Sequence, residues 1–192
     1  RSDSGTEAAR SRSARPGTGS RVARLWRCLR IEMDSPPALT DWTGFSKLLN
    51  AVWCYSGSAE TCAALKLMAL LYPRPGEMRQ AEWAEIDFDR AFWTIPAGRA
   101  KMRRQHKKPL PALAMEILRA QRELTGNLRL IFPSSTSPEK PLSENPMNLG
   151  LRRMGFGKDD ATSHGFRATA STLLNESGLW GSDAIEAELA HI

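Results

Sequence analysis

Hydrophobic residues recur along most of this chain at the spacing of a helix. Between residues 42 and 53 they fall three and four positions apart, at Trp42, Phe45, Leu48, Leu49, Val52 and Trp53. This spacing predicts a helix that Thr40 caps and that ends before Gly57. Residues 59–71 are apolar on most sides, which predicts a second helix at the centre of the fold. The sequence YPRPG breaks that helix, and a short helix is expected from Pro75.

Beyond residue 82 the pattern changes to short runs rich in Trp, Phe and Ile. Residues 83–88 and 91–96 read as two strands joined by a turn at 87–90, and residues 105–110 as a third strand. Helical spacing resumes at 111–124, 143–154, 164–177 (closed by Gly178) and 182–190, with a Pro/Ser loop at 132–141. The pattern predicts an α+β, mainly α fold: a helical domain with one small three-stranded antiparallel sheet.

Residues 1–36 differ from the rest of the chain. They are rich in Arg, Ser and Gly and have little apolar content before Val22, so they lack the surface that would offset the entropy cost of folding. We expect a disordered basic tail or linker, natural or added in cloning. A targeting peptide is the alternative, although no apolar segment typical of a secretory signal is present. The folded domain is expected to span residues 37–192.

The net charge of +6 belongs to that tail. Eight of the 27 Lys and Arg but two of the 21 Asp and Glu lie in residues 1–31. The body is therefore neutral, and any contact with nucleic acid must depend on local clusters of charge. Cys28, Cys54 and Cys62 form no C-x-x-C pair, which argues against a disulfide framework or a zinc ribbon and favours a reducing compartment. No apolar run approaches the roughly 18–20 residues of a membrane span.

Arg74 is the first candidate for chemistry. It directly precedes Pro75, which suits the first position of a helix. A cation is unfavourable near a helix N-terminus unless an anion binds there too, because backbone amides and guanidinium then converge on it. The alternative is a surface arginine paired with Glu77 or Glu82.

The second candidate is the sequence TSHGFR at residues 162–167. Thr162 or Ser163 is expected to cap the helix, and His164 and Arg167 then lie within one turn of each other. An imidazole and a guanidinium at such a place suit a phosphate, since Arg binds two oxygens and His donates or moves a proton. The alternative is a solvated helix face with a partly packed histidine.

The third candidate is a basic stretch between two predicted strands. Seven of the ten positions from 99 to 108 are basic or His. A hairpin arm along a nucleic-acid backbone fits this pattern, and a solvated run of charge is the alternative. The expected DNA contacts are Arg99, Arg103, Arg104, Lys107 and Lys108. The sequence has no phosphate-binding glycine loop, zinc motif or nucleophile elbow, and neither a metal nor another cofactor is expected.

Taken in order, these features resemble a known family. The matching stretches include ALKLMALLYPRPGEMR at 64–79, KMRR at 101–104, SHGFRATASTLLNE at 163–176 and AIEAELAH at 184–191. They are similar to the catalytic domain of the tyrosine recombinases, specifically the phage-type integrases of prophages and other mobile elements. The resemblance runs from about residue 37 to the end of the chain.

The resemblance implies a site-specific DNA integrase and recombinase that needs no metal or nucleotide. In that family a Tyr hydroxyl attacks a phosphodiester, which forms a 3′-phosphotyrosyl link and releases a 5′-hydroxyl. Residue by residue, Arg74 and Arg167 would hold the non-bridging oxygens, and Lys101 would protonate the leaving oxygen. His164 would assist proton transfer, and His191 would hydrogen-bond the phosphate.

The resemblance also sets expectations about partners. The intact enzyme would act on double-stranded attachment sites as a homotetramer, at the nucleoid in the bacterial cytoplasm. The family's nucleophilic Tyr lies on the order of ten residues after the position of His191, and neither Tyr55 nor Tyr72 matches it. We expect a C-terminally incomplete chain that does not cleave DNA and is mostly monomeric. A remnant that only binds DNA or a partner is the alternative.

Overall fold

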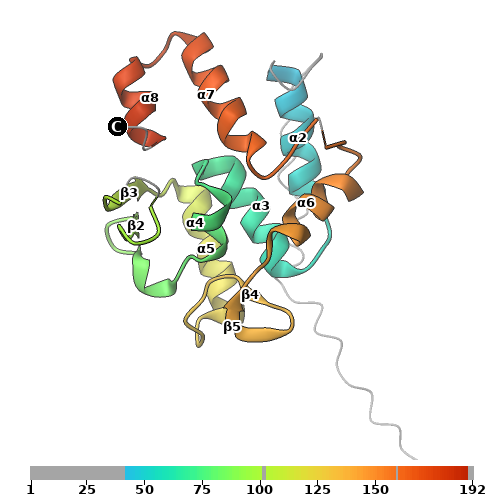
Figure 1. Cartoon of the computed structure of the whole chain (residues 1–192), viewed down its shortest axis with the longest axis vertical. Helices are drawn as coiled ribbons and strands as arrows, with labels where there is room; N and C mark the ends of the chain where they lie inside the picture. Colours follow the sequence, from blue (N-terminus) through green and yellow to red (C-terminus); the bar gives the residue numbers. More distant parts are fainter. Residues whose placement is uncertain (1–41, 101–102, 159, 190–192) are drawn as a thin grey trace, which may run out of the picture.

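The computed structural model describes residues 42–100, 103–158 and 160–189. Figure 1 shows a group of packed helices with a small sheet at one side. The elements are α2 (Trp42–Cys54), α3 (Ala59–Leu71), α4 (Pro75–Arg79), the 3₁₀ turn η1 (Trp83–Glu85), β1 (Ile86–Asp87), β2 (Phe92–Ile95), β3 (His106–Pro109), α5 (Ala112–Thr125), β4 (Pro133–Ser134), β5 (Ser137–Pro141), α6 (Glu144–Arg153), α7 (Gly165–Ser177) and α8 (Ser182–Glu188). The expected helices are confirmed, with ends that differ by at most two residues. The proposed cap Thr40 lies outside the described residues.

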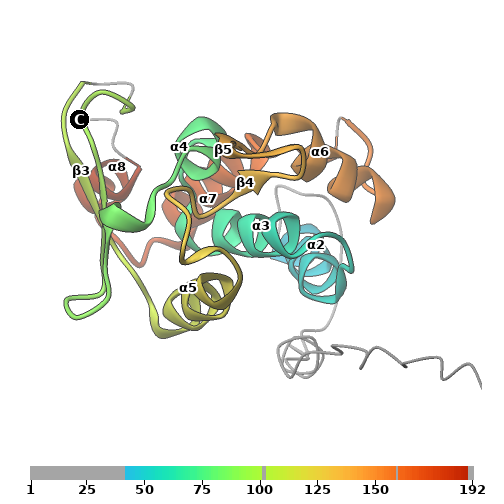
Figure 2. The ribbon, with the colours of Figure 1, turned by 90° about the horizontal axis from the view of Figure 1, so that it is seen from below.

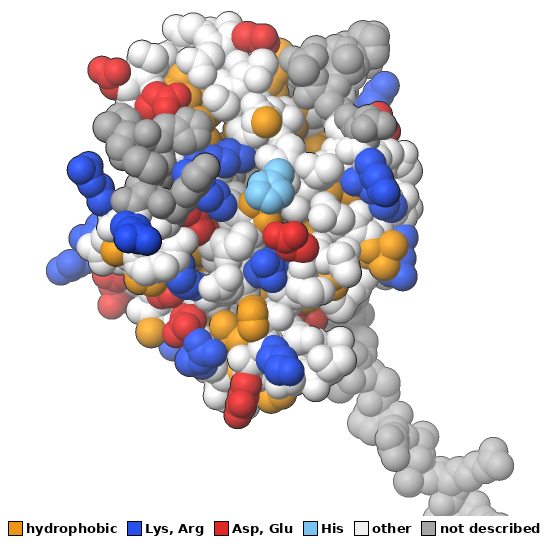
Figure 3. Space-filling view, in the orientation of Figure 1, with side chains coloured by type: hydrophobic (Ala, Val, Ile, Leu, Met, Phe, Trp, Pro, Cys, Tyr) orange, Lys and Arg blue, Asp and Glu red, His pale blue; other side chains and the backbone are white. Residues whose placement is uncertain are grey.

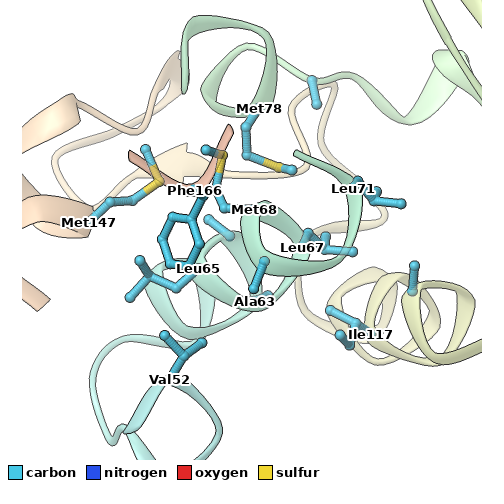
Figure 4. Close-up of a cluster of buried hydrophobic side chains, with 14 of the residues drawn as sticks. Val52, Ala63, Leu65, Leu67, Met68, Leu71, Met78, Ile117, Met147 and Phe166 are labelled. Carbon is cyan, nitrogen blue, oxygen red and sulfur yellow. The ribbon is translucent and has the colours of Figure 1, made fainter. Parts of the chain in front are cut away.

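Helix α3 is the centre of the core. Ser58 Oγ accepts a hydrogen bond from the Thr61 amide and so begins the helix. Tyr72 ends it in the left-handed conformation, with φ 49°. Figure 4 shows its buried side chains surrounded by side chains of the neighbouring helices, among them Val52, Met78, Ile117, Met147 and Phe166. In the described ranges no helix is both long and apolar enough to cross a membrane.

The expected three-stranded antiparallel sheet is confirmed, in the order β1-β2-β3. Trp93 of β2 pairs with Ile86 of β1 and with Lys108 of β3. The turn between β1 and β2 is fixed by Asp87, whose carboxylate accepts hydrogen bonds from the amides of residues 89 and 90. Figure 2 shows the sheet at one edge of the domain, with α8 beside β3.

Two local predictions were wrong. Residues 83–85 form a 3₁₀ turn instead of the start of a strand, because Trp83 is anchored by a bond from its indole nitrogen to the Thr125 carbonyl oxygen. The expected loop at 132–141 is a short hairpin of β4 and β5, extended by a bond from the Leu142 amide to the Phe132 carbonyl. Its prolines are the reason that the pattern suggested a loop.

Candidate active site

Arg74 lies at the start of α4, and Glu77 fixes its side chain. The Arg74 amide donates to Glu77 Oε2 at 2.8 Å, and its Nη1 donates to Glu77 Oε1 at 3.0 Å. The first bond is half of a capping box, and Pro75 occupies the first helical position as expected. Glu77 is 3% exposed. The pairing with Glu77 that we considered as the alternative is therefore present, and its result is a guanidinium held beside the helix N-terminus.

Arg167, in the first turn of α7, lies in the same site. Its Nη1 donates to the Tyr72 carbonyl oxygen at 3.1 Å, two residues before Arg74. Burial lowers the pKa of Arg167, and the positive charge of Arg74 lowers it further. Among the described residues, the buried Nη2 of Arg167 has no hydrogen-bond partner. Two neighbouring guanidiniums with a free buried N–H group form a site that favours an anion.

His164 is exposed immediately before α7. The Arg167 amide donates to its carbonyl oxygen at 3.2 Å, so both residues belong to the same turn. The expected capping by Thr162 is present, since Thr162 Oγ1 accepts from the Gly165 amide at 3.0 Å. Ser163 instead donates its amide to Asn148 Oδ1 and is buried. The structure thus places an imidazole on the solvent side of the turn that holds Arg167.

Lys108 has an environment that the sequence reading missed. Its side chain is 1% exposed, and its Nζ donates to Glu188 Oε1 at 2.6 Å and to the Glu188 carbonyl oxygen at 2.8 Å. Burial lowers the pKa of Lys108, while the charge of Glu188 raises it. Lys107 and Pro109 are exposed on either side. Side chains alternate between the two faces of a strand, and this alternation could have predicted that Lys108 faces inward.

The other predicted DNA contacts divide into two groups. Arg103, Arg104 and Lys107 are exposed between β2 and β3 or on β3 itself. Arg99 is 17% exposed and forms an ion pair with Glu85, which also accepts a bond from the Trp93 indole. Figure 3 shows Lys and Arg side chains spread over the visible face below α7 and α8, with acidic side chains among them. Arg99 and Lys108 thus form ion pairs within the domain. Arg103, Arg104 and Lys107 face solvent.

Two predicted catalytic residues, Lys101 and His191, lie outside the described residues. His106, at the start of β3, is half-buried, and burial followed by the charge of Lys108 lowers its pKa. Burial, followed by the charge of Glu188, raises the pKa of Tyr72, which keeps its phenol protonated. Over the described ranges, no three His, Cys, Asp or Glu side chains are grouped in a way that could hold a metal ion.

Comparison with known proteins identifies the family. Residues 45–192 match the model of the phage integrase family. The integrase of Enterobacteria phage P4 is 39% identical over 168 residues, which cover 81% of this chain and 38% of that protein. Prophage integrase IntA of Escherichia coli K12 is 40% identical over 146 residues, which cover 76% of this chain and 35% of that protein. The chain thus spans less than two fifths of the length of these relatives.

The fold has known counterparts among solved structures. The crystal structure of XerH site-specific recombinase bound to difH substrate, a pre-cleavage complex, superposes with a TM-score of 0.65 at 16% identity. The match covers 84% of this chain and 50% of that chain. It confirms the expected fold class, a tyrosine recombinase catalytic domain. The family match and the curated relatives agree with it, and this chain belongs to the phage integrase family.

Proposed function

We propose that this chain is the catalytic domain of a site-specific recombinase that integrates and excises a mobile DNA element. The observation that carries the proposal is that Nη2 of Arg167, beside the Arg74–Glu77 pair, has no hydrogen-bond partner within the part of the chain that the structure describes. A phosphodiester would supply the anion that this site favours. Its two non-bridging oxygens match two guanidiniums, which would stabilise the charge on a pentavalent phosphorus.

The chemistry would proceed by transesterification. A Tyr hydroxyl attacks the phosphorus, a new P–O bond forms to the Tyr oxygen, and the P–O5′ bond breaks. Lys101 would give a proton to the leaving 5′-oxygen, and His164 would help to remove the proton of the Tyr. His191 would donate a hydrogen bond to the phosphate. We expect the nucleophile beyond residue 192, since the two tyrosines at positions 55 and 72 do not match the family's segment.

Duplex DNA is the proposed partner. Arg103, Arg104 and Lys107 are exposed on and before β3, and such side chains would add salt-dependent contacts with the phosphate backbone. The intact enzyme would assemble as a homotetramer on its attachment sites, at the nucleoid in the bacterial cytoplasm. The 192-residue chain itself would be monomeric. Light scattering that shows a stable tetramer of this chain without DNA would contradict that part.

The decisive experiment supplies the tyrosine. The source DNA is read in frame beyond codon 192, and a Tyr codon is expected within about fifteen codons. The protein extended through that Tyr is then incubated with duplex DNA that flanks its gene, and we expect an adduct that survives detergent. Arg167→Lys should abolish the adduct because the single ammonium group of lysine cannot bind the Tyr72 carbonyl oxygen and hold the phosphate as the two ends of the guanidinium would. Arg119→Lys, on the exposed side of α5, is the matched control and should leave it unchanged.

Two results would contradict the proposal. One is a reading frame that stops without a Tyr, since the transesterification then has no nucleophile. The other is an adduct that forms equally well in Arg167→Lys and Arg119→Lys, since Arg167 would then have no part in holding the phosphate.

A further inference from the structure

A buried lysine joins the sheet to the last described helix. Nζ of Lys108, on β3, donates two hydrogen bonds to Glu188 at the end of α8, one to its side chain and one to its main chain. Figures 1 and 2 both place α8 beside β3. Because Lys108 is 1% exposed, its ammonium group cannot reach a DNA backbone in this arrangement.

Glu188, the partner of this lysine, acts electrostatically on Arg167. Burial and the charge of Arg74 lower the pKa of Arg167, and the negative charge of Glu188 partly opposes this lowering; Glu188 acts on Tyr72 and His106 as well. Glu77 of α4 and Glu186 of α8 also act on Arg167. A carboxylate that paired with Arg167 would repel a phosphate or take its place on the guanidinium. Glu77 is bound to Arg74, and Glu188 is bound to Lys108.

We propose that Lys108 is a positioning residue for the two-arginine site, because it holds Glu188 of α8 against β3 and keeps this carboxylate from pairing with Arg167. The inference rests on the proposed function, since it concerns how that site stays open to a phosphate. The Glu188 side chain is 33% exposed, so it is not confined by packing alone. If the ammonium group of Lys108 is removed, the Glu188 carboxylate loses its partner, and Arg167 is a cation on which the charge of Glu188 already acts. The Nη2 of Arg167 would then no longer be free.

The same contact fixes the end of α8. Helix α8 ends at Glu188, and its last main-chain oxygen accepts from Lys108. His191 follows three residues later in the sequence. The position from which the chain continues toward His191 therefore depends on a side chain 80 residues earlier.

The test separates Lys108 from Glu188 by substitution. Lys108→Met removes the charge and keeps the length of the side chain, and Lys108→Met/Glu188→Gln removes both charges. Lys140→Met is the charge-matched control, on the exposed β5. The probe is inorganic sulfate, a tetrahedral dianion whose charge is constant from mild acid to alkali. The two readouts are the Nε–H NMR signal of Arg167 without any ligand and the dissociation constant of sulfate. Thermal unfolding monitors the fold of each variant.

We expect Lys108→Met to shift the Arg167 signal and to weaken sulfate binding about tenfold, equivalent to ~1.4 kcal/mol. The double variant should restore both readouts to near the parent values, and Lys140→Met should change neither. An unshifted Arg167 signal in Lys108→Met would overturn the inference, and so would a double variant as weak as the single one. A parent chain that binds neither sulfate nor duplex DNA would instead overturn the proposed function, and the Arg167 signal would still decide the role of Lys108.

If Lys108→Met does not fold, the parent chain and Glu188→Gln provide a second test. Raising the pH deprotonates Lys108 at a lower pH than usual for lysine, because its pKa is lowered. Charged groups on three other elements act on Lys108: Glu188 on α8, Arg167 on α7 and Glu77 on α4. The parent should lose sulfate affinity on deprotonation, as Glu188 is released. Glu188→Gln should not show that loss, and equal loss in both proteins would overturn the inference.

Discussion

Glu77→Gln tests how the first arginine is held. The Glu77 carboxylate is 3% exposed and accepts two bonds from Arg74, one from the amide and one from Nη1. In the variant the amide oxygen can keep one of these bonds. The NH₂ group, which is a donor, then meets the other donor of Arg74 and makes no bond with it.

The magnitude follows from that geometry. Losing one charge-assisted bond and leaving a donor without a partner costs about 1.5–3 kcal/mol. The Arg74 side chain is 21% exposed, so water recovers part of the loss, and we expect the free energy of unfolding to fall by about 2 kcal/mol. For a domain of this size, this lowers Tm by about 4–8 °C.

Thermal unfolding followed by circular dichroism measures the difference. Glu116→Gln, which makes the same change on the exposed face of α5, is the control. Sulfate should stabilise Glu77→Gln more than the parent, because an anion replaces the lost negative charge between the two guanidiniums. If Glu77→Gln unfolds at the same temperature as Glu116→Gln, with and without sulfate, the pairing of Arg74 with Glu77 has no role in holding the site.

Substitutions at three further positions, Thr162, Gly178 and His106, test single local features. Thr162→Ala should lower the free energy of unfolding by about 1 kcal/mol in urea titrations, and Thr162→Ser should not, because the serine hydroxyl still accepts from the Gly165 amide. Gly178→Ala should cost about 1 kcal/mol, since residue 178 has φ 63°. Gly76→Ala, in open space within α4, should be neutral or stabilising in the same titration. His106 has a lowered pKa, so the unfolded chain takes up its proton first and stability should fall as the pH drops below about 6.5. His106→Gln should remove that part of the loss, and an unchanged pH profile would contradict this assignment.

Where helix ends are marked by local chemistry, the sequence was sufficient to predict them. Helix α3 begins after Ser58, whose side chain caps it, and its apolar run continues to Leu71. Pro75 sets the start of α4 for the same kind of reason, since it suits the first turn. Both of these start signals act on backbone groups within four residues along the sequence, so the sequence alone shows them.

Contacts between distant segments were beyond that reasoning. Glu188 lies 80 residues from Lys108, and nothing in its local sequence singles it out as a partner. Arg99 was assigned to DNA with the rest of the basic stretch, although it pairs with Glu85 across the hairpin. A run of charge shows that cations gather in the sequence, but the fold decides which of them face solvent.

The left-handed residue at the end of α3 has a mechanical consequence. Tyr72 turns the chain out of the helix with φ 49°, and its carbonyl oxygen receives Nη1 of Arg167. Arg74 follows two peptide units later, through the buried Pro73. The spacing of the two guanidinium groups therefore depends on a short and stiff stretch of backbone, because Arg167 binds to Tyr72 and Arg74 follows it after one proline. The site is therefore preorganised for a tetrahedral anion, and little rearrangement of the two arginines is needed when the anion binds.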